Sequence, residues 1–435
     1  MTGEPQSSFH PRAEASAPNE RIAILGGGIS GLSLGWLLSR QGRHVTLFEA
    51  SDQTGGLART FEWHGLPCDL APHRLHTSDK TILSEIQGLV PLRKFERRSR
   101  ILMRGKQIRD PINPLELLVR FAPRVGLSLV WGYLNRPSLP ENSFEHLALN
   151  RYGRGLYDFF FEPYTRKLLG VPPPDISVTW GREKLRSSGL LDALRGDSKT
   201  FFKTFWYPRQ GGYGAIGDAM LARIRGDVLL ESQVTGFSAA GGRIQSVHYR
   251  RHGVDCRFDC DRVFSTIPVT RLARLFGADL ALRYRSIQLV YINVRRARVM
   301  PYHWVYFGDG DVPINRMAEI KHFHPDLPAT GNSVLCAEVT RETARPVDDT
   351  LAALTRYRLL DERDVDDALV LPEPFGYPVY DRGFEAAKAE ADALFRRYGN
   401  LHRVGRNAEF RHIELDEDLA SAIECLESIY RWAFP

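Results

Sequence analysis

The chain has 435 residues, of which 43% are hydrophobic and 25% charged, enough for a folded core of two or three domains or one interwoven unit. Its 58 basic and 52 acidic residues leave a net charge of +6, which permits an anionic small-molecule substrate but does not indicate a nucleic-acid partner. Five scattered cysteines fit neither a disulfide framework nor a zinc motif, so we expect reduced thiols, no metal site and a cytoplasmic protein.

Two segments bear on targeting and membranes. Residues 1–20 contain mainly polar and small residues without the apolar core of a signal peptide, which predicts a disordered tail. Residues 127–134 are apolar but far too few to cross a bilayer. We therefore expect no transmembrane span, while peripheral contact with a membrane surface stays open.

The first strong pattern lies at residues 22–49. A short apolar run at 22–25 predicts one buried parallel strand, followed by GGGISG at 26–31 and a helical pattern through Arg40. A second strand is predicted at 44–48 and ends on Glu49. Strand, glycines, helix, strand and acid in this order predict a βαβ unit that binds a dinucleotide.

Each residue type in this unit has a physical role. Gly26 allows a tight turn, Gly28 lets the backbone approach a pyrophosphate, and Gly31 lets helix and strand pack closely. The helix N-terminus offers unpaired N–H groups to the phosphates, and Glu49 can accept hydrogen bonds from the ribose hydroxyls. The predicted site also includes their neighbours Ile29, Ser30 and Ala50.

The next residues select the dinucleotide. Gly55-Gly56-Leu57-Ala58-Arg59-Thr60 gives E-x(5)-G-G-x-x-R-T, which resembles the extended fingerprint of the FAD enzymes that include amine oxidases, protoporphyrinogen oxidases, phytoene desaturases and UDP-galactopyranose mutases. In that family the second glycine pair and the arginine continue the flavin pyrophosphate site. The resemblance implies FAD as the cofactor, with Gly56, Leu57, Ala58 and Arg59 in its site.

The segment GLPCDLAPHRLHTS at 65–78 resembles the flavin-proximal loop of the same family. It shares features with the G-G-H-R-F form of the protoporphyrinogen-oxidase-like branch and with the G-x-H-x-x-H-T form of the mutases. The resemblance implies that Pro72 and His73 contact the flavin and that His73 and Arg74 are catalytic. It departs from the family at Ala71, where glycine is usual. A buried, hydrogen-bonded structural histidine is the alternative for His73.

A basic run follows at residues 93–109, with a predicted hairpin that turns at Gly105. Such a run is usually a solvated face, and its functional alternative is a rim that attracts an anionic substrate. From 114 to 194 the pattern is helical, with an N-cap entry at Asn142-Ser143-Phe144-Glu145 and an aromatic-rich segment that resembles the substrate domain of the protoporphyrinogen-oxidase-like branch.

The middle of the chain predicts a return to the cofactor domain. A P-x-G-G-type entry at 208–214 leads to a helix at 215–224, and strands are predicted at 229–234, 244–249 and 261–268. By resemblance, Val234 lies beside the adenine and Thr266 near the adenosine end of FAD.

Alternating residues at 284–340 predict an antiparallel sheet as the floor of the substrate cavity. We expect the H-x-H at 322–324 to lie in a surface loop rather than bind a metal, and the acidic stretch 348–367 to be helical.

The C-terminal segment resembles the family again. A strand is predicted at 401–404, followed by Gly405-Arg406 and an acid-led helix that opens at Leu415. The resemblance implies that Gly405 and Arg406 meet the flavin phosphate or ribityl chain. It also implies that Asp418 and Leu419 face the isoalloxazine ring, where the helix dipole favours reduced flavin.

Together these patterns predict an α/β fold with two parts: a Rossmann-type FAD-binding domain at 21–90, 205–275 and 398–435, and an inserted substrate domain of mixed helices and antiparallel sheet at 91–204 and 276–397. The resemblance implies an oxidoreductase in which a small-molecule substrate gives hydride to flavin N5. A redox-neutral sugar-nucleotide mutase that uses reduced flavin is the alternative, and a non-enzymatic flavoprotein is the least favoured.

Overall fold

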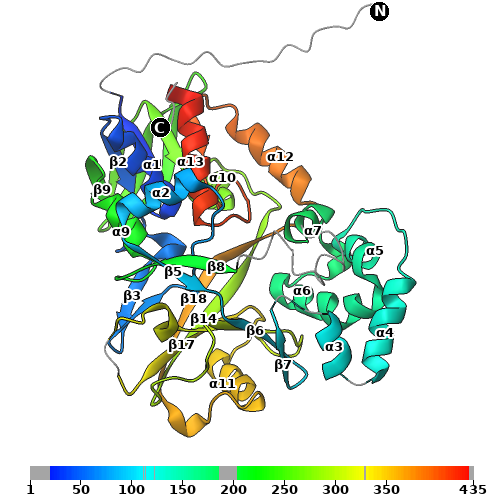
Figure 1. The fold of residues 1–435 in the computed structure, drawn as a ribbon. Helices are drawn as coiled ribbons and strands as arrows, with labels where there is room; N and C mark the ends of the chain where they lie inside the picture. The colour runs from blue at the N-terminus through cyan, green and yellow to red at the C-terminus, as the bar shows by residue number, and fades with distance from the viewer. Residues whose placement is uncertain are drawn as a thin grey trace, which may run out of the picture.

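A five-stranded parallel sheet forms one end of the molecule (Figure 1). The computed structural model describes residues 20–110, 112, 114–121, 123–185, 203–327 and 330–430, so the predicted tail and the end of the predicted helical region lie outside it. The strand order is β19-β13-β1-β2-β9, and every neighbouring pair is parallel. The bounds are β1 (Ile22–Leu25), β2 (Val45–Phe48), β9 (Gly226–Leu229), β13 (Arg262–Ser265) and β19 (Leu401–Arg403).

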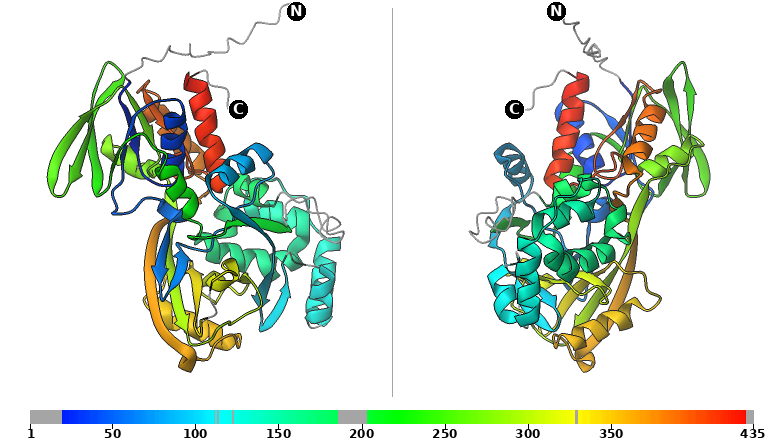
Figure 2. Two further views of the ribbon diagram at one scale, coloured as in Figure 1. Left: turned by 60° about the vertical axis from the view of Figure 1, so that its left-hand side comes forward. Right: turned by 90° about the vertical axis from the view of Figure 1, so that its right-hand side faces the viewer.

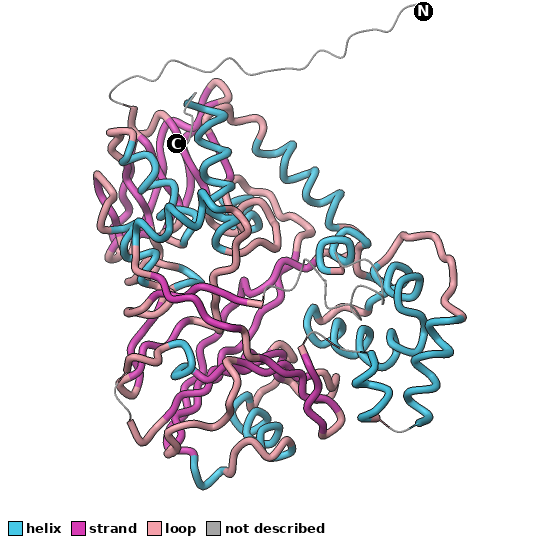
Figure 3. The backbone as a smooth tube through the Cα atoms, in the orientation of Figure 1, coloured by secondary structure: helices cyan, strands magenta, loops and turns pink. Residues whose placement is uncertain are grey.

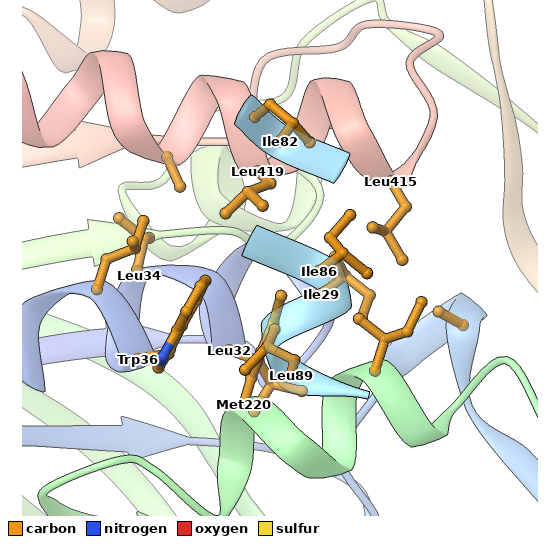
Figure 4. Packing of buried hydrophobic residues seen from close by; sticks show 14 of the residues in the cluster. Ile29, Leu32, Leu34, Trp36, Ile82, Ile86, Leu89, Met220, Leu415 and Leu419 are labelled. Carbon is orange, nitrogen blue, oxygen red and sulfur yellow. The ribbon is translucent and has the colours of Figure 1, made fainter. Parts of the chain in front are cut away.

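Both faces of this sheet are covered, which is why its central strands are continuous apolar runs. Ile22 and Ile24 of β1 point to one core cluster, whereas Ala23 and Leu25 point to another. Four helices pack on the first face, where Figure 4 shows side chains from all of them meeting. They are α1 (Ile29–Arg40), α2 (Lys80–Leu89), α9 (Ala215–Leu221) and α13 (Leu415–Tyr430).

The second face is covered by two helices and a three-stranded sheet. Figure 2 shows this small sheet extending from the outer margin of the parallel-sheet part. The elements are α10 (Val269–Leu275), α12 (Phe384–Phe395), β10 (Ser232–Ala240), β11 (Arg243–Arg251) and β12 (Val254–Asp259). The predicted strand at 229–234 is two strands, because Glu231 takes a left-handed conformation (φ 51°) between β9 and β10.

A seven-stranded sheet forms the opposite end, in the order β18-β14-β17-β16-β15-β6-β7. Its central strands are antiparallel, as the alternation at 284–340 predicts, and β15 pairs with β6 in parallel. The bounds are β6 (Ser99–Met103), β7 (Lys106–Arg109), β14 (Arg283–Val294), β15 (Trp304–Phe307), β16 (Ile314–Glu319), β17 (Ser333–Val339) and β18 (Val365–Val379). Two short antiparallel pairs, β3 (Thr60–Trp63) with β4 (Leu66–Asp69) and β5 (Leu92–Glu96) with β8 (Thr204–Pro208), complete the strands.

The prediction of a helix across 348–367 is wrong in its second half. Helix α11 (Pro346–Arg356) ends early, a 3-10 turn follows at Glu362–Asp364, and Asp366 and Asp367 lie in β18. The strand forms because β14 pairs along its length, and Asp366 there accepts hydrogen bonds from Asn293 and Arg295. Tertiary pairing therefore overrides the local helical preference.

A helical group lies beside the seven-stranded sheet, and Figure 3 separates it from the strands. It contains α3 (Pro114–Arg120), α4 (Pro123–Leu134), α5 (Phe144–Leu156), a π-helical turn (Tyr157–Phe161), α6 (Glu162–Leu169) and α7 (Val178–Lys184). The predicted N-cap is confirmed, because the Ser143 side chain accepts from the His146 N–H at 3.2 Å. None of the described helices has the length and apolarity that a bilayer crossing requires.

Candidate functional site

The predicted cofactor residues converge at the carboxyl ends of the parallel strands. Gly26 follows β1, Glu49 follows β2, Thr266 follows β13, and Gly405 lies two residues after β19. Hydrogen bonds join these loops: the Gly26 N–H donates to Phe48 O at 2.8 Å, and the Thr266 hydroxyl donates to Leu25 O at 2.9 Å. In open parallel sheets this edge is where ligands bind.

The glycines have the geometry that their predicted roles require. Gly26 has φ 100°, and a Cβ on Gly31 would lie 1.9 Å from Gly26 O, so helix α1 can approach the loop only with glycine there. Gly28 is the N-cap of α1 and provides no side-chain cap, so the first N–H groups of the helix, at Ile29 and Ser30, keep their capacity to bind an anion.

The second glycine pair lies directly against the first. The Gly55 N–H donates to Gly27 O at 2.8 Å, and a Cβ on Gly56 would lie 3.0 Å from the Gly28 Cα. Gly56, Leu57 and Ala58 form a short 3-10 turn that Arg59 ends. The two glycine motifs thus form one continuous backbone surface at the N-terminus of α1.

Glu49 is held in place by its own loop. One carboxylate oxygen accepts from the Gly27 N–H at 2.7 Å, and the other accepts from the Ser51 N–H at 2.9 Å and the Ser51 hydroxyl at 2.7 Å. The first oxygen keeps a free acceptor position for a ribose hydroxyl. Ala50 beside it is exposed, and Val234 in β10 follows Ser232, whose N–H donates to Glu49 O.

The His73 ring donates a hydrogen bond to backbone carbonyls. Its Nε2 lies 2.8 Å from Leu57 O and 2.9 Å from Leu70 O, so this nitrogen carries the proton, and the ring stacks on Tyr213 at 5.1 Å. Burial lowers the pKa of His73 most, and the positive charge of Arg316 lowers it further. Both effects keep the ring neutral. The hydrogen-bonded structural histidine that the sequence left open is therefore present, and it ties the 3-10 turn to Leu70, the residue that follows β4.

The rest of this loop explains the departure from the family pattern. Ala71 takes φ 71°, a left-handed conformation that favours glycine, and its N–H lies 3.2 Å from the Tyr291 hydroxyl. Pro72 is buried. The guanidinium of Arg74 lies over the ring of Trp304, 4.5 Å from its centroid, at the junction between the two large sheets.

The C-terminal residues close the site around Ser30. Asp418 accepts from the Ser30 hydroxyl and from the Arg406 N–H, both at 2.8 Å, and burial raises the pKa of Asp418 to about 6. Gly405 has φ 89°, and a Cβ there would lie 2.0 Å from the Ser30 Oγ. The Leu419 side chain is fully buried in the core beside α1, so only its backbone could reach a ligand.

A second polar cluster, which the sequence reasoning missed, lies on the neighbouring sheet. Arg316 of β16 donates to Glu338 of β17 at 2.9 Å, and the Tyr377 hydroxyl of β18 donates to the same carboxylate. The Tyr377 ring stacks on His412 at 5.3 Å, and the Arg406 guanidinium lies 5.6 Å from the Tyr377 ring centroid. We call Arg316, Glu338, Tyr377 and His412 the sheet cluster. Its sequence signal is the presence of charged residues within predicted buried strands, in INRMAE and SVLCAEV.

Electrostatics join the sheet cluster to the cofactor loops. Burial alone would raise the pKa of Glu414, but the charges of Arg74, Arg406 and Arg316 hold it below its usual value. Burial drives the pKa of His412 well below 6.5, and the nearby cations lower it further. The region therefore contains arginines, neutral histidines and the carboxylates Glu338 and Glu414, so an anion would bind through the guanidinium N–H groups that these carboxylates leave free.

Two other predicted features have different outcomes. The surface-loop prediction for the H-x-H is wrong: His322 and His324 are buried, with His322 Nε2 2.6 Å from Met300 O. Within the described ranges, no group of three or more His, Cys, Asp or Glu side chains could hold a metal. In the 93–109 run most basic side chains are solvated, but Arg97 forms a largely buried ion pair with Asp110.

A surface pocket of about 680 Å³ lies apart from these groups, lined by residues of 170–175, 280–283 and 381–383. None of the predicted site residues lines it.

The residues at the sheet edge fit a flavin dinucleotide. The glycine surface and the uncapped N-terminus of α1 suit a pyrophosphate, and Glu49 suits a ribose. Toward the sheet cluster, Arg406 Nε, Asn407 Oδ1 and His412 Nδ1 are buried without a partner among the described residues. Buried polar groups are seldom left unpaired, so a polar ligand at this end would complete them.

Comparison with known proteins agrees with this geometry. The family model for flavin containing amine oxidoreductases matches residues 29–293. A mitochondrial protoporphyrinogen oxidase of Nicotiana tabacum is 26% identical over 40% of the chain and 39% of the relative. A dTDP-fucopyranose mutase of Escherichia coli is 21% identical over 94% of the chain and 97% of the relative. A solved structure of reduced UDP-galactopyranose mutase superposes with a TM-score of 0.80, at 21% identity over 94% of this chain and 93% of that one.

The chain spans about 40% of the length of the first curated relatives that it matches. These matches therefore do not assign the activities of those relatives to this chain. The match to the family model, in contrast, covers more than half of the chain and includes the second glycine pair at 55–56, the flavin-proximal loop and β13. The chain belongs to the family of flavin-containing amine oxidoreductases, and FAD is its cofactor.

Proposed function

We propose that the protein is an FAD-dependent oxidoreductase that acts on a small anionic molecule. The observation that carries the proposal is the meeting of two sets of residues: the dinucleotide cradle at the parallel sheet and the arginine-bearing sheet cluster beside it. When bound, FAD takes two electrons from the substrate as a hydride at N5. The chain then has to bind, orient and desolvate the substrate.

The named residues would share these tasks. Gly26, Gly28, Gly31 and Glu49 would hold the adenosine and pyrophosphate end of FAD, and His73 and Arg74 would line the flavin. Arg316 would receive an anionic group, because Glu338 fixes its guanidinium through Nε and leaves other N–H groups free. Tyr377, whose one hydroxyl proton goes to Glu338, would hold that carboxylate in place. A planar guanidinium held in this way presents paired donors to a carboxylate or phosphate.

The division into domains is part of the same proposal. The three chain pieces 21–90, 205–275 and 398–435 contribute every strand of the parallel sheet, which supports their assignment to FAD binding. The pieces 91–204 and 276–397 would then provide the substrate side. A cytoplasmic location fits the scattered cysteines, which are all free.

A second candidate function is redox-neutral isomerisation of a nucleotide sugar by reduced flavin. Two observations favour it: the match to the mutase relative covers 97% of that relative's length, and the sheet cluster would suit a diphosphate. We favour oxidoreduction because the matched family model is that of oxidoreductases and covers residues 29–293. For either reaction we place the substrate at the sheet cluster.

The first experiment tests cofactor and anion binding together. Purified protein should be yellow and release FAD on denaturation, and substrate from a panel of small carboxylates and phosphates should bleach it without oxygen. Arg316→Met should raise the substrate concentration for half reduction at least about tenfold, because a charge-assisted hydrogen bond is lost. Arg341→Met, on an exposed arginine whose bond is to Asp311 O, is the matched control. Equal behaviour of the two variants would contradict the assigned anion site.

A further inference from the structure

We propose that helix α4 seats the protein on an anionic lipid surface. Its outer face is apolar: Leu127, Trp131 and Leu134 are 69%, 71% and 71% exposed, and Val130 lies between them at 43%. The spacing of three and four residues puts these side chains on one side of the helix. Val119 at the end of α3 is 86% exposed. These residues, with Val254, are the large hydrophobic side chains that stand out as exposed in the described chain.

The apolar face points outward because the opposite face of α4 packs closely against the backbone of α5. A Cβ on Gly132 of α4 would lie 2.4 Å from the Gly155 nitrogen of α5, and a Cβ on Gly155 would lie 2.3 Å from Ser128 O. A Cβ on Gly153 would lie 1.9 Å from Gly132 O. The helix therefore cannot rotate to bury Trp131 and the leucines against α5, since only glycines fit at that contact. Its large apolar side chains are left for a partner outside the fold.

The charge around this face selects the partner. Residues 100–136 contain seven basic and two acidic side chains, 7 − 2 = +5, most of the net charge of the whole chain. Arg124 and Arg136 are exposed at the two ends of α4, and the Arg136 guanidinium lies 4.4 Å from the Tyr133 ring centroid. Long basic side chains beside apolar ones suit the headgroup region of an anionic bilayer.

Position and shape favour the same partner. Figures 1 and 2 place α4 at the outer margin of the helical group, where no described element covers it. Exposed tryptophan is typical of residues that lie at the level of lipid headgroups. A second copy of the chain is disfavoured, because it would bring two basic surfaces together.

The test uses the full, FAD-loaded chain and vesicles of phosphatidylcholine with about 30% phosphatidylglycerol, an anionic surface that attracts basic side chains. Co-sedimentation should show binding to these vesicles and much weaker binding to phosphatidylcholine alone. Trp131→Gln with Leu134→Gln should lower the partition coefficient at least about tenfold, because two apolar side chains leave the acyl boundary. Val254→Gln, on an exposed valine of β12, is the matched apolar control.

Charge is tested separately. Arg124→Gln should lower binding to the anionic vesicles about fivefold and leave binding to phosphatidylcholine unchanged. Arg274→Gln, on an exposed arginine of α10, is the matched control. FAD content and thermal unfolding establish that each variant is folded.

Three results would overturn the proposal. They are absence of vesicle binding by the unmodified protein at low salt, equal losses in the α4 variant and the Val254 control, and self-association without lipid that the α4 variant abolishes. The last result, measured by sedimentation velocity, would identify a second copy as the occupant of this face. These outcomes do not depend on the proposed reaction.

Discussion

Gly28 differs from the other glycines of the cradle in what surrounds it. A Cβ on Gly31 would overlap the backbone, whereas a Cβ on Gly28 meets only Gly56 Cα, at 3.9 Å. A small side chain at Gly28 is thus compatible with the fold, and a large one would occupy the space in front of α1. Packing alone does not require a glycine there, which agrees with the proposed approach of the backbone to a ligand.

This difference separates cofactor binding from stability. Gly28→Leu should reduce the FAD content at limiting cofactor strongly while changing the thermal midpoint of the FAD-free protein little. Glu49→Ala should also reduce FAD content, and it removes the bonds to Gly27 and Ser51 as well. Gly88→Leu, at an exposed position of α2 with nothing within 4 Å, is the matched control. Full FAD occupancy in both site variants would refute the assigned cradle.

His73 should affect turnover more than FAD content. His73→Ala removes the donor shared by Leu57 O and Leu70 O, which shifts the flavin-proximal loop but leaves the cradle at Gly28 and Glu49 in place. We expect a fall in kcat or a changed flavin potential, with restoration by His73→Gln, whose amide can donate. Since burial lowers the pKa of His73, the pH profile of the unmodified enzyme should show no step from this ring near pH 6.5. Loss of FAD in proportion to activity would contradict this role.

Helices and strands that are determined by neighbouring residues could be predicted from the sequence. Those that depend on contacts with residues far away in the chain could not. Helix α1 and its flanking strands follow from apolar runs and glycines within about thirty residues, as in other βαβ units. Strand β18 follows from its pairing with β14, which lies some seventy residues earlier. The burial of His322 and His324 likewise depends on Met300 and Tyr207, which no local pattern links to them.

Helix α6 has a pH-dependent link to the loop before β16. The Lys167 ammonium is buried and donates to Phe307 O, to Asp309 O at 3.0 Å and to Ile314 O at 2.9 Å. Burial lowers the pKa of Lys167 to about 7, from 10.5 in an exposed lysine. Between these values the unfolded chain binds one proton more than the folded chain, so this lysine makes stability rise with pH.

The prediction compares two slopes. From about pH 7 to 10 the free energy of unfolding of the unmodified protein should rise relative to that of Lys167→Met, by at most about 1.4 kcal/mol per pH unit. Lys167→Met is expected to be less stable at every pH, because three carbonyls lose their donor. The difference in slope, measured by urea unfolding at several pH values, is the diagnostic quantity. Parallel curves would show that the lysine stays charged in the fold.

At the scale of the whole molecule, the candidate site lies between two sheets, and the sequence predicted candidate residues on one of them but not on the other. The FAD side could be anticipated because glycines and acids have fixed places after parallel strands. The sheet cluster could not, because Arg316, Glu338 and Tyr377 come from three strands whose order, β18-β14-β17-β16, is a property of the folded sheet. That this sheet forms the floor of the substrate cavity stays a prediction, and that prediction named none of these three side chains.

The reaction class is decided by what happens across the junction of these sheets. If Arg316 holds an anionic substrate for oxidation, that substrate alone should bleach the oxidised flavin in the absence of oxygen, and the product should be lighter by two hydrogens. An isomerisation would need flavin that is reduced beforehand and would return a product of identical mass.

Both reactions would suffer from Arg316→Met, so loss of activity in that variant cannot separate them. The flavin redox state that the unmodified enzyme requires for turnover does separate them. We expect turnover from the oxidised enzyme. Conversion of a nucleotide sugar to an isomer only after reduction with dithionite would replace oxidoreduction with the second candidate and leave the assigned cofactor and anion sites standing.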